Sequence, residues 1–286
     1  GFFSNYTFDM IKIATYTFLI GMLIFGKGIS LFGQSSLSGQ QIAIIDEPNL
    51  DQYGKVLFED SMMDDWQDNW ILDGKKAIVL HNCDGLFFSG GSVTKSEDPE
   101  NYHAHHAVLW TKEVFEGDLL ITYEMTRIDS SDYGNTLLYI QAQGIGNEPY
   151  VENIAKWRKL REIPAMSLYF ENMDLISLSF RENLRCKRYP WKDPNGEWYP
   201  NRGLIEPMVD YGGMVPDKKY SVEVEKRKLS VTLRLYDGVT KEKLTDYTWN
   251  TTKVPEDLDP IQKGRIGLRH MSTKQFIYRN FKVEQL

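Results

Sequence analysis

Cysteine and histidine are scarce in this chain of 286 residues, and basic residues are outnumbered by acidic ones. Only two cysteines, Cys83 and Cys186, and five histidines occur. Two cysteines exclude a disulfide-stapled scaffold and a cysteine-rich zinc site, and they leave either one disulfide or two buried free thiols. The formal net charge is −7. An acidic chain is a poor partner for nucleic acid, whose binding needs a basic surface.

Several catalytic motifs are missing as well. No Gly-x-Ser-x-Gly elbow occurs, and the paired glycines at 90–91 and 212–213 lack the spacing and the lysine of a phosphate-binding loop. No Asp-rich calcium loop of the EF-hand type is present. Glu124 and Glu171 lie outside the Glu-x-Asp-x-x-Glu pattern of jelly-roll glucanases, which weakens the hypothesis of a paired-carboxylate glycosidase. We expect no cofactor and leave a structural calcium ion open.

The longest apolar run lies near the N-terminus. After Met10 and one lysine, residues 13–25 are mainly apolar and are followed by small and polar residues. This order is typical of a secretory signal peptide, and the run is short for a membrane span. We predict an N-terminal extension and signal peptide over residues 1–40, cleaved near Gly33 or Gln34. Residues 41–286 would form a single catalytic domain, exported to a bacterial periplasm or beyond; an uncleaved anchor is the alternative.

Hydrophobic alternation with period two predominates in the rest of the chain. The segments 118–128, 135–143, 165–171, 219–227 and 229–238 are among those that predict strands, and Gly- or Asp-bearing turns separate many of them. Many short strands indicate an all-β sandwich or jelly roll of antiparallel sheets. Only residues 151–162 have a helical pattern, as a short insertion. Residues 186–216 form an irregular stretch whose aromatic side chains suit either stacking on sugars or packing of the loop itself.

Three histidines fall within four residues, at the start of a predicted strand. His103 and His105 are two apart and would share a strand face, as zinc ligands can, but no His-rich or Cys-rich motif supplies a third ligand. We therefore favour acid–base chemistry over a metal site. Alternation puts His106 and Trp110 on one face and Ala107 on the opposite, core-facing side. His106 is the first candidate, and His105 is its rival.

Tyrosine, arginine and glutamine occur on other predicted strands, and alternation puts two of them, Tyr139 and Gln141, on one face. These residue types suit elimination next to a carboxylate. Arginine or glutamine neutralises a uronate carboxyl group, a histidine or tyrosine removes the C5 proton, and a second one protonates the oxygen leaving C4. The simpler explanation for most arginines on outer strands is that they solvate the surface. The further candidates are Arg181, Arg185, Tyr189, Arg269 and His270.

Four longer segments carry a more specific pattern: HHAVLWTKEVFEGDLLITYE, LLYIQAQG, LSFRENLRCKRYP and GRIGLRHMSTKQFIYRNFKV. In the last, G-x-I-G-x-R-x-M is followed by Y-x-N-F-K-V. With these segments, the chain from Leu57 to the C-terminus resembles a family of bacterial concanavalin A-like jelly-roll proteins found in rhamnogalacturonan- and ulvan-utilisation gene clusters. A marine branch of that family dehydrates ulvan oligosaccharides. The positions that match the family pattern are His106, Trp110, Asn183, Leu184, Arg185, Tyr189 and Arg269.

The resemblance implies a concanavalin A-like jelly roll and an oligosaccharide dehydratase, which we expect to be a monomer. Such an enzyme removes water across C4–C5 of a terminal uronic acid of ulvan-type oligosaccharides and leaves the 4,5-unsaturated uronate. Its partner is the saccharide, with no nucleic acid and no membrane after cleavage of the signal. Two alternatives stay open, a non-catalytic lectin-like module that binds carbohydrate and an endo-acting jelly-roll lyase.

Residue chemistry and resemblance together give each candidate a role. His106 or His105 would be base or acid, Tyr189 or Tyr139 its partner, and Arg185 with Gln141 would hold the carboxylate. The remaining candidates would position the sugar; they are Trp110, Arg181, Arg269, His270 and Trp191.

Overall fold

The chain folds into two packed antiparallel sheets. The computed structural model describes residues 54–253 and 258–286, so the predicted signal peptide and its cleavage site lie outside the described residues. Each sheet has eight strands. Within the described residues, no helix is both long enough and apolar enough to span a bilayer. Both cysteines are free thiols, and Cys83 is exposed whereas Cys186 is buried.

The first sheet, called here the β7 sheet, contains the C-terminal strand and a three-stranded meander. Its order is β14 (Lys243–Asn250), β13 (Ser230–Asp237), β12 (Lys219–Arg227), β7 (Leu119–Arg127), β16 (Gln275–Gln285), β4 (Gly85–Ser89) and β3 (Ile78–Asn82). The remaining strand, β1 (Val56–Asp60), also pairs with β16.

The second sheet, called here the β8 sheet, contains the predicted site residues. Its order is β11 (Leu204–Asp210), β10 (Asn183–Tyr189), β9 (Met173–Phe180), β8 (Thr136–Gly144), β15 (Lys263–Met271), β5 (His106–Thr111) and β2 (Trp70–Asp73), and β6 (Phe115–Glu116) also pairs with β15. Short 3-10 helices and one α-helix connect the strands of both sheets. They are η2 (Trp66–Asp68), η3 (Tyr102–His105), η4 (Ile154–Arg161), α1 (Met166–Asn172), η5 (Pro200–Gly203) and η6 (Thr251–Lys253).

The main hydrophobic core lies between the sheets, because alternate residues of each strand point inward. Ala107 and Leu109 of β5, Leu138 and Ile140 of β8, and Leu268 of β15 all belong to it. The predicted all-β jelly-roll sandwich is therefore confirmed, and so is the predicted alternation along the strand that begins at His106.

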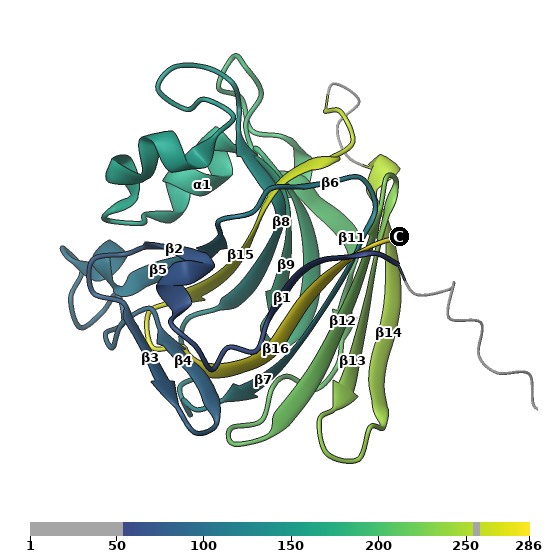
Figure 1. The fold of residues 1–286 in the computed structure, drawn as a ribbon. Coiled ribbons are helices and arrows are strands. Elements are labelled where there is room, and N and C mark those ends of the chain that lie inside the picture. The colour runs from purple at the N-terminus through teal and green to yellow at the C-terminus, as the bar shows by residue number, and fades with distance from the viewer. Residues whose placement is uncertain (1–53, 254–257) are drawn as a thin grey trace, which may run out of the picture. The chain divides into compact units, whose positions relative to one another are not determined.

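A second hydrophobic cluster covers the opposite side of the β8 sheet, which we call the outer face. Val108, Trp110, Leu137, Tyr139 and Leu175 belong to this face. The insertion formed by η4 and α1 packs on it with Ile154, Trp157 and Tyr169. Figure 1 shows the insertion beside β8 and β15, on the side away from β12–β14.

Two local predictions are wrong, one in the insertion and one at a bulge in β8. Residues 165–171, predicted as a strand, form most of α1, since Met, Leu and Glu are good helix formers and seven residues do not separate the two periods clearly. In β8 the pairing register shifts between Ile140 and Gln143, and Gln141 has a φ of 51°. The bulge separates Gln141 from the face of Tyr139 and brings Ala142 there instead.

Candidate functional site

Cross-strand pairing brings three of the predicted residues together on the outer face. Arg269 of β15 pairs with Val108 of β5 on one side and with Leu137 of β8 on the other. His106 opens β5, and its Nδ1 lies 3.3 Å from Nη2 of Arg269. The Arg269 guanidinium lies 4.1 Å from the ring centre of Tyr169 and 5.9 Å from that of Tyr139. We call His106, Tyr139 and Arg269 the outer-face triad.

Asp73 at the end of β2 is the anion that organises the surroundings of the triad. Its Oδ2 accepts hydrogen bonds from Trp110 Nε1 at 2.7 Å, Arg161 Nε at 2.5 Å and the Tyr169 hydroxyl at 3.1 Å. Trp110 lies across Gly267, where a Cβ atom would be only 2.5 Å from the indole ring. The glycine therefore leaves room for the indole, and the indole reaches across to Asp73.

Charge is not balanced in this buried region. Asp73 forms its ion pair with Arg161, and no carboxylate of the described residues forms an ion pair with Arg269, so one positive charge is left over. Burial, helped by the nearby Arg269, lowers the pKa of His106 to about 3, and burial raises the pKa of Tyr139. At neutral pH the triad therefore consists of a neutral imidazole, a protonated phenol and a guanidinium cation.

Several polar atoms of the triad are buried without a partner. His106 Nε2 and Arg269 Nε and Nη1 make no hydrogen bond within the described part of the chain, and the Tyr139 hydroxyl lies close to Tyr189 and Arg269 without a hydrogen bond of normal geometry. Most buried polar atoms in folded proteins are paired, because each unpaired one loses its hydration without compensation. Unpaired donors and acceptors gathered in one place are available to a ligand.

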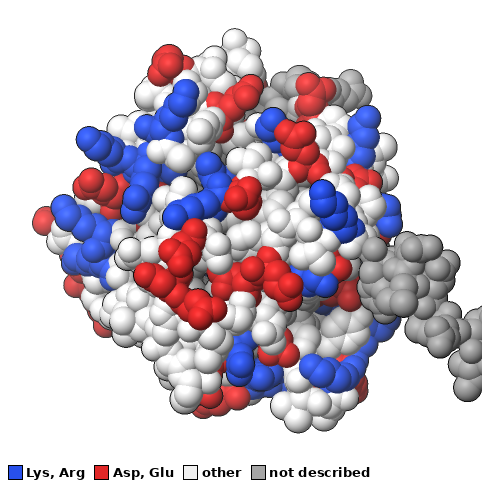
Figure 2. Space-filling view, in the orientation of Figure 1, with Lys and Arg blue, Asp and Glu red and all other residues white. Residues whose placement is uncertain are grey.

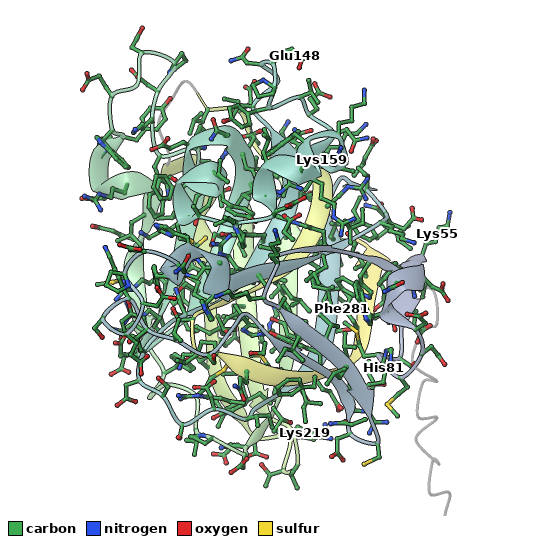
Figure 3. The ribbon with its side chains drawn as sticks, turned by 90° about the vertical axis from the view of Figure 1, so that its left-hand side faces the viewer. Lys55, His81, Glu148, Lys159, Lys219 and Phe281 are labelled. Atoms are coloured by element: carbon green, nitrogen blue, oxygen red, sulfur yellow. The ribbon has the colours of Figure 1, made fainter. Side chains whose placement is uncertain are left out.

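The triad is closed off from solvent in this structure. His106, Tyr139 and Arg269 each have a relative exposure of 0%. The ring of Tyr102 meets His106 edge-on at a centroid distance of 4.7 Å, and Arg269 Nη2 donates to the Pro164 carbonyl at 2.8 Å. From the side shown in Figure 3, the coils of the insertion near Lys159 lie in front of the strands. A ligand therefore reaches the triad only when side chains that cover it move.

The two other candidate histidines lie elsewhere. His105 turns away from His106: its Nδ1 accepts from the Ser92 amide at 3.2 Å, and its Nε2 lies 3.1 Å from Lys76 Nζ. His270 points into the main core, where Thr136 Oγ1 is 2.6 Å from Nδ1 and the Tyr278 hydroxyl is 3.0 Å from Nε2. Adjacent strand residues point to opposite faces, so His270 cannot share the face of its neighbour Arg269.

The remaining candidates divide between the outer face and other surfaces. Tyr189 is buried beside Tyr139, with ring centres 5.8 Å apart, and Arg185 lies partly exposed on the same face. Trp110 is 1% exposed, so it packs the site and presents no open ring to a sugar. Gln141 donates to the Gly117 carbonyl at 2.9 Å instead of facing the triad.

Arg181 and Trp191 lie away from the triad. Arg181 in the β9–β10 turn is 3.5 Å from Glu182 and lines a cavity of about 630 Å³ at one end of the sandwich. Trp191 stacks on Phe170 with ring centres 4.3 Å apart.

Sequence reasoning missed the residues that support the triad. Asp73 precedes a glycine, a sequence that is common in turns. Arg161 lies at the end of a polar helical stretch. Tyr169 fell in the segment predicted as a strand. None of these carries a motif, because their partners lie far apart in the chain. Within the described residues, no group of three or more His, Cys, Asp or Glu side chains is arranged to hold a metal ion.

Comparisons with known proteins give the fold but no family. No protein-family model and no curated protein matches the chain. A Bacillus subtilis protein of unknown function with a galectin-like fold has 18% identity and a TM-score of 0.58, over 82% of this chain and 97% of its own. Lectin II from Ulex europaeus has 10% identity and a TM-score of 0.46, covering 80% and 98% of the two chains. A carbohydrate-binding module from Bacillus subtilis has 10% identity and a TM-score of 0.42, covering 76% and 96%. The first of these likenesses supports a galectin-like jelly-roll fold.

Proposed function

We propose that the chain binds a saccharide that ends in a uronic acid and removes water across C4–C5 of that sugar. The observation that carries the proposal is Arg269, a fully buried cation with two unpaired nitrogens beside a neutral histidine and a protonated tyrosine. A buried charge without a counter-ion is costly, so the site favours an anionic ligand. The uronate carboxylate has the charge and the acceptor atoms that this position lacks.

The three members of the triad match the three requirements of an elimination. Arg269 neutralises the carboxylate, which acidifies the proton on C5. His106 takes that proton on its unprotonated ring nitrogen, and Tyr139 donates a proton to the hydroxyl that leaves C4 as water. The electron pair of the C5–H bond becomes the C4–C5 double bond. Nothing but the saccharide and the three side chains enters this balance.

Binding of the substrate also tunes the base. Burial is the main cause of the low pKa of His106, and the positive charge of Arg269 adds to it. A carboxylate bound to Arg269 cancels the second of these causes, so the pKa of His106 is higher in the complex than in the free protein. The base is thus strengthened when the substrate arrives.

The charge on the exposed surface of the insertion supports the proposal of an anionic ligand. Lys156, Arg158 and Lys159 of η4 are exposed, and Figure 2 shows several basic side chains on this side of the molecule. Such a patch attracts anions and speeds their encounter with the site. The proposed ligand is an ulvan-type oligosaccharide. The protein would bind it as a monomer, in the periplasm or outside the cell.

Matched histidine variants test the proposal. The protein is incubated with uronate-ended oligosaccharides, and the absorbance of the unsaturated product is followed together with its mass. His106→Gln should lower the rate at least about 100-fold, the scale of general acid–base catalysis, whereas His105→Gln should stay within about threefold. Equal rates in the two variants, or no consumption of any uronate-ended substrate, would refute the enzyme proposal.

A binding module without turnover is the second candidate. The closed state of the triad favours it, since the reactive atoms are inaccessible as they stand. It predicts that Arg269→Gln weakens saccharide binding while no substrate is ever consumed. Mass measurement separates the enzymes, because a dehydratase removes one water without shortening the chain and an endo-acting lyase cleaves it.

A further inference from the structure

The outer face continues beyond the triad onto β10, where two more cations lie. Arg185 and Lys187 are both partly exposed, and each pairs with a serine of β9, Ser179 and Ser177 respectively. Both side chains therefore share the outer face with Tyr139, which pairs with Ser177 from the other side. The proposed function assigns neither of them a direct role.

Neither of these cations forms an ion pair within the described residues. Lys187 Nζ lies 4.4 Å from the ring centre of Trp191, and no hydrogen bond or ion pair of its ammonium is found in the described ranges. Arg185 Nε is buried without a partner there. Glu182 on the same turn is exposed and pairs with Arg181, and Arg185 only adds to the lowering of its pKa.

The surroundings of Lys187 disfavour the charged form of its side chain. Burial, followed by repulsion from Arg185 and Arg202, lowers the pKa of its ammonium to about 8. Packing two like charges side by side on a half-buried face is unfavourable unless an anion joins them.

The strand register fixes the separation between this pair and the triad. Arg185, Ser179, Leu137 and Arg269 form one continuous cross-strand row. Three strand spacings separate the Cα atoms of Arg185 and Arg269, which is about 14 Å. A separation of this size between the backbone positions favours two anionic groups on different residues of a saccharide over two groups on one sugar ring.

We propose that Arg185 and Lys187 form a second anion-binding subsite, which holds a sulfate ester or a second carboxylate on the saccharide whose terminal uronate binds at Arg269. This inference rests on the proposed function for the position of the first anion. It specifies the ligand as an oligosaccharide with at least two negative groups.

The test measures binding by calorimetry with three matched trisaccharides, each with one terminal uronate. One carries a sulfate ester on another sugar, one carries a carboxylate there, and one is uncharged there. The wild-type protein should bind at least one doubly charged probe about tenfold more tightly than the singly charged one. Comparison of the two doubly charged probes identifies which anion the subsite takes.

Substitutions of the two cations show whether they cause the tighter binding of doubly charged probes. Lys187→Met keeps an apolar chain on Trp191, and it should reduce the advantage of the second charge to about twofold or less, as should Arg185→Gln. Lys192→Met is the control, because Lys192 is nearby but already pairs with Glu171 at 2.9 Å; it should keep the tenfold advantage. Equal binding of all probes by the wild type, or an advantage that survives both variants, would overturn the subsite.

Failure of the subsite and failure of the proposed function give different results. The binding assay needs no turnover. A tenfold advantage that Lys187→Met removes, without any unsaturated product, supports the subsite and refutes the dehydratase. Turnover of the singly charged trisaccharide without any binding advantage refutes the subsite and leaves the dehydratase intact.

Discussion

At the scale of single residues, Asp73 holds the outer face together. It accepts hydrogen bonds from Trp110, Arg161 and Tyr169, and its side chain is fully buried with that of Arg161. Each of these donors in turn packs against the triad or against the insertion. An anion in this position offsets one of two buried guanidinium groups, and the other is left for a ligand.

Asp73→Asn tests this role through stability. The variant leaves Arg161 buried without a counter-ion, so the free energy of unfolding should fall by about 3–5 kcal/mol in urea titrations. Asp246→Asn is the matched control, because Asp246 pairs with Lys243 at the surface and its loss should change stability by less than about 1 kcal/mol. Similar losses in both variants would show that Asp73 has no special role.

At the scale of elements, hydrophobic periodicity predicted most of the strands, but it missed an edge strand and a bulge. Strands such as β7 and β12 alternate cleanly, because one side packs in the core and the other is partly exposed. β11 was hidden in the predicted irregular stretch, since it contains Pro207 and exposes most of its residues, as edge strands do. The bulge at Gln141 left no signal in the alternation either.

The contact between β5 and β15 gives an element-scale prediction. In Gly267→Ala the new Cβ would lie 2.5 Å from the Trp110 indole, so the ring must shift and its hydrogen bond to Asp73 weakens. We expect a loss of about 1–3 kcal/mol in unfolding free energy and altered tryptophan fluorescence. Unchanged stability and an unchanged spectrum would contradict the packing described for Trp110.

At the scale of the whole molecule, the site depends on pairings between distant parts of the chain. His106, Tyr139 and Arg269 were candidates from sequence because of their residue types. Their convergence follows from the pairing of β15 with both β5 and β8, which no local pattern encodes. The same holds for Asp73 and Arg161, which are 88 positions apart in sequence.

The core histidine makes stability depend on pH. Burial lowers the pKa of His270 to about 3, from an ordinary value of 6.5. Above pH 6.5 both the folded and the unfolded chain hold this residue neutral, so it has no effect. As the pH falls from 6.5 toward 3, only the unfolded chain takes up the proton, and stability is lost by about 1.4 kcal/mol per pH unit.

Denaturation of the wild type and of His270→Gln at several pH values checks this slope. The unfolding free energy of the wild type minus that of the variant should decrease steadily between pH 6 and pH 4, because the variant lacks the titrating group. A difference that does not change with pH would show that His270 is protonated in the folded core or titrates normally.

The most direct test of the central claim is the mass of a uronate-ended disaccharide after incubation with the protein. If His106, Tyr139 and Arg269 carry out the elimination, the disaccharide loses one water, gains ultraviolet absorbance and keeps its glycosidic bond. Arg269→Lys should abolish this change, because lysine cannot present the same fixed donors to a carboxylate. An unchanged mass with the wild type, or the same product at the same rate with Arg269→Lys, would contradict the account.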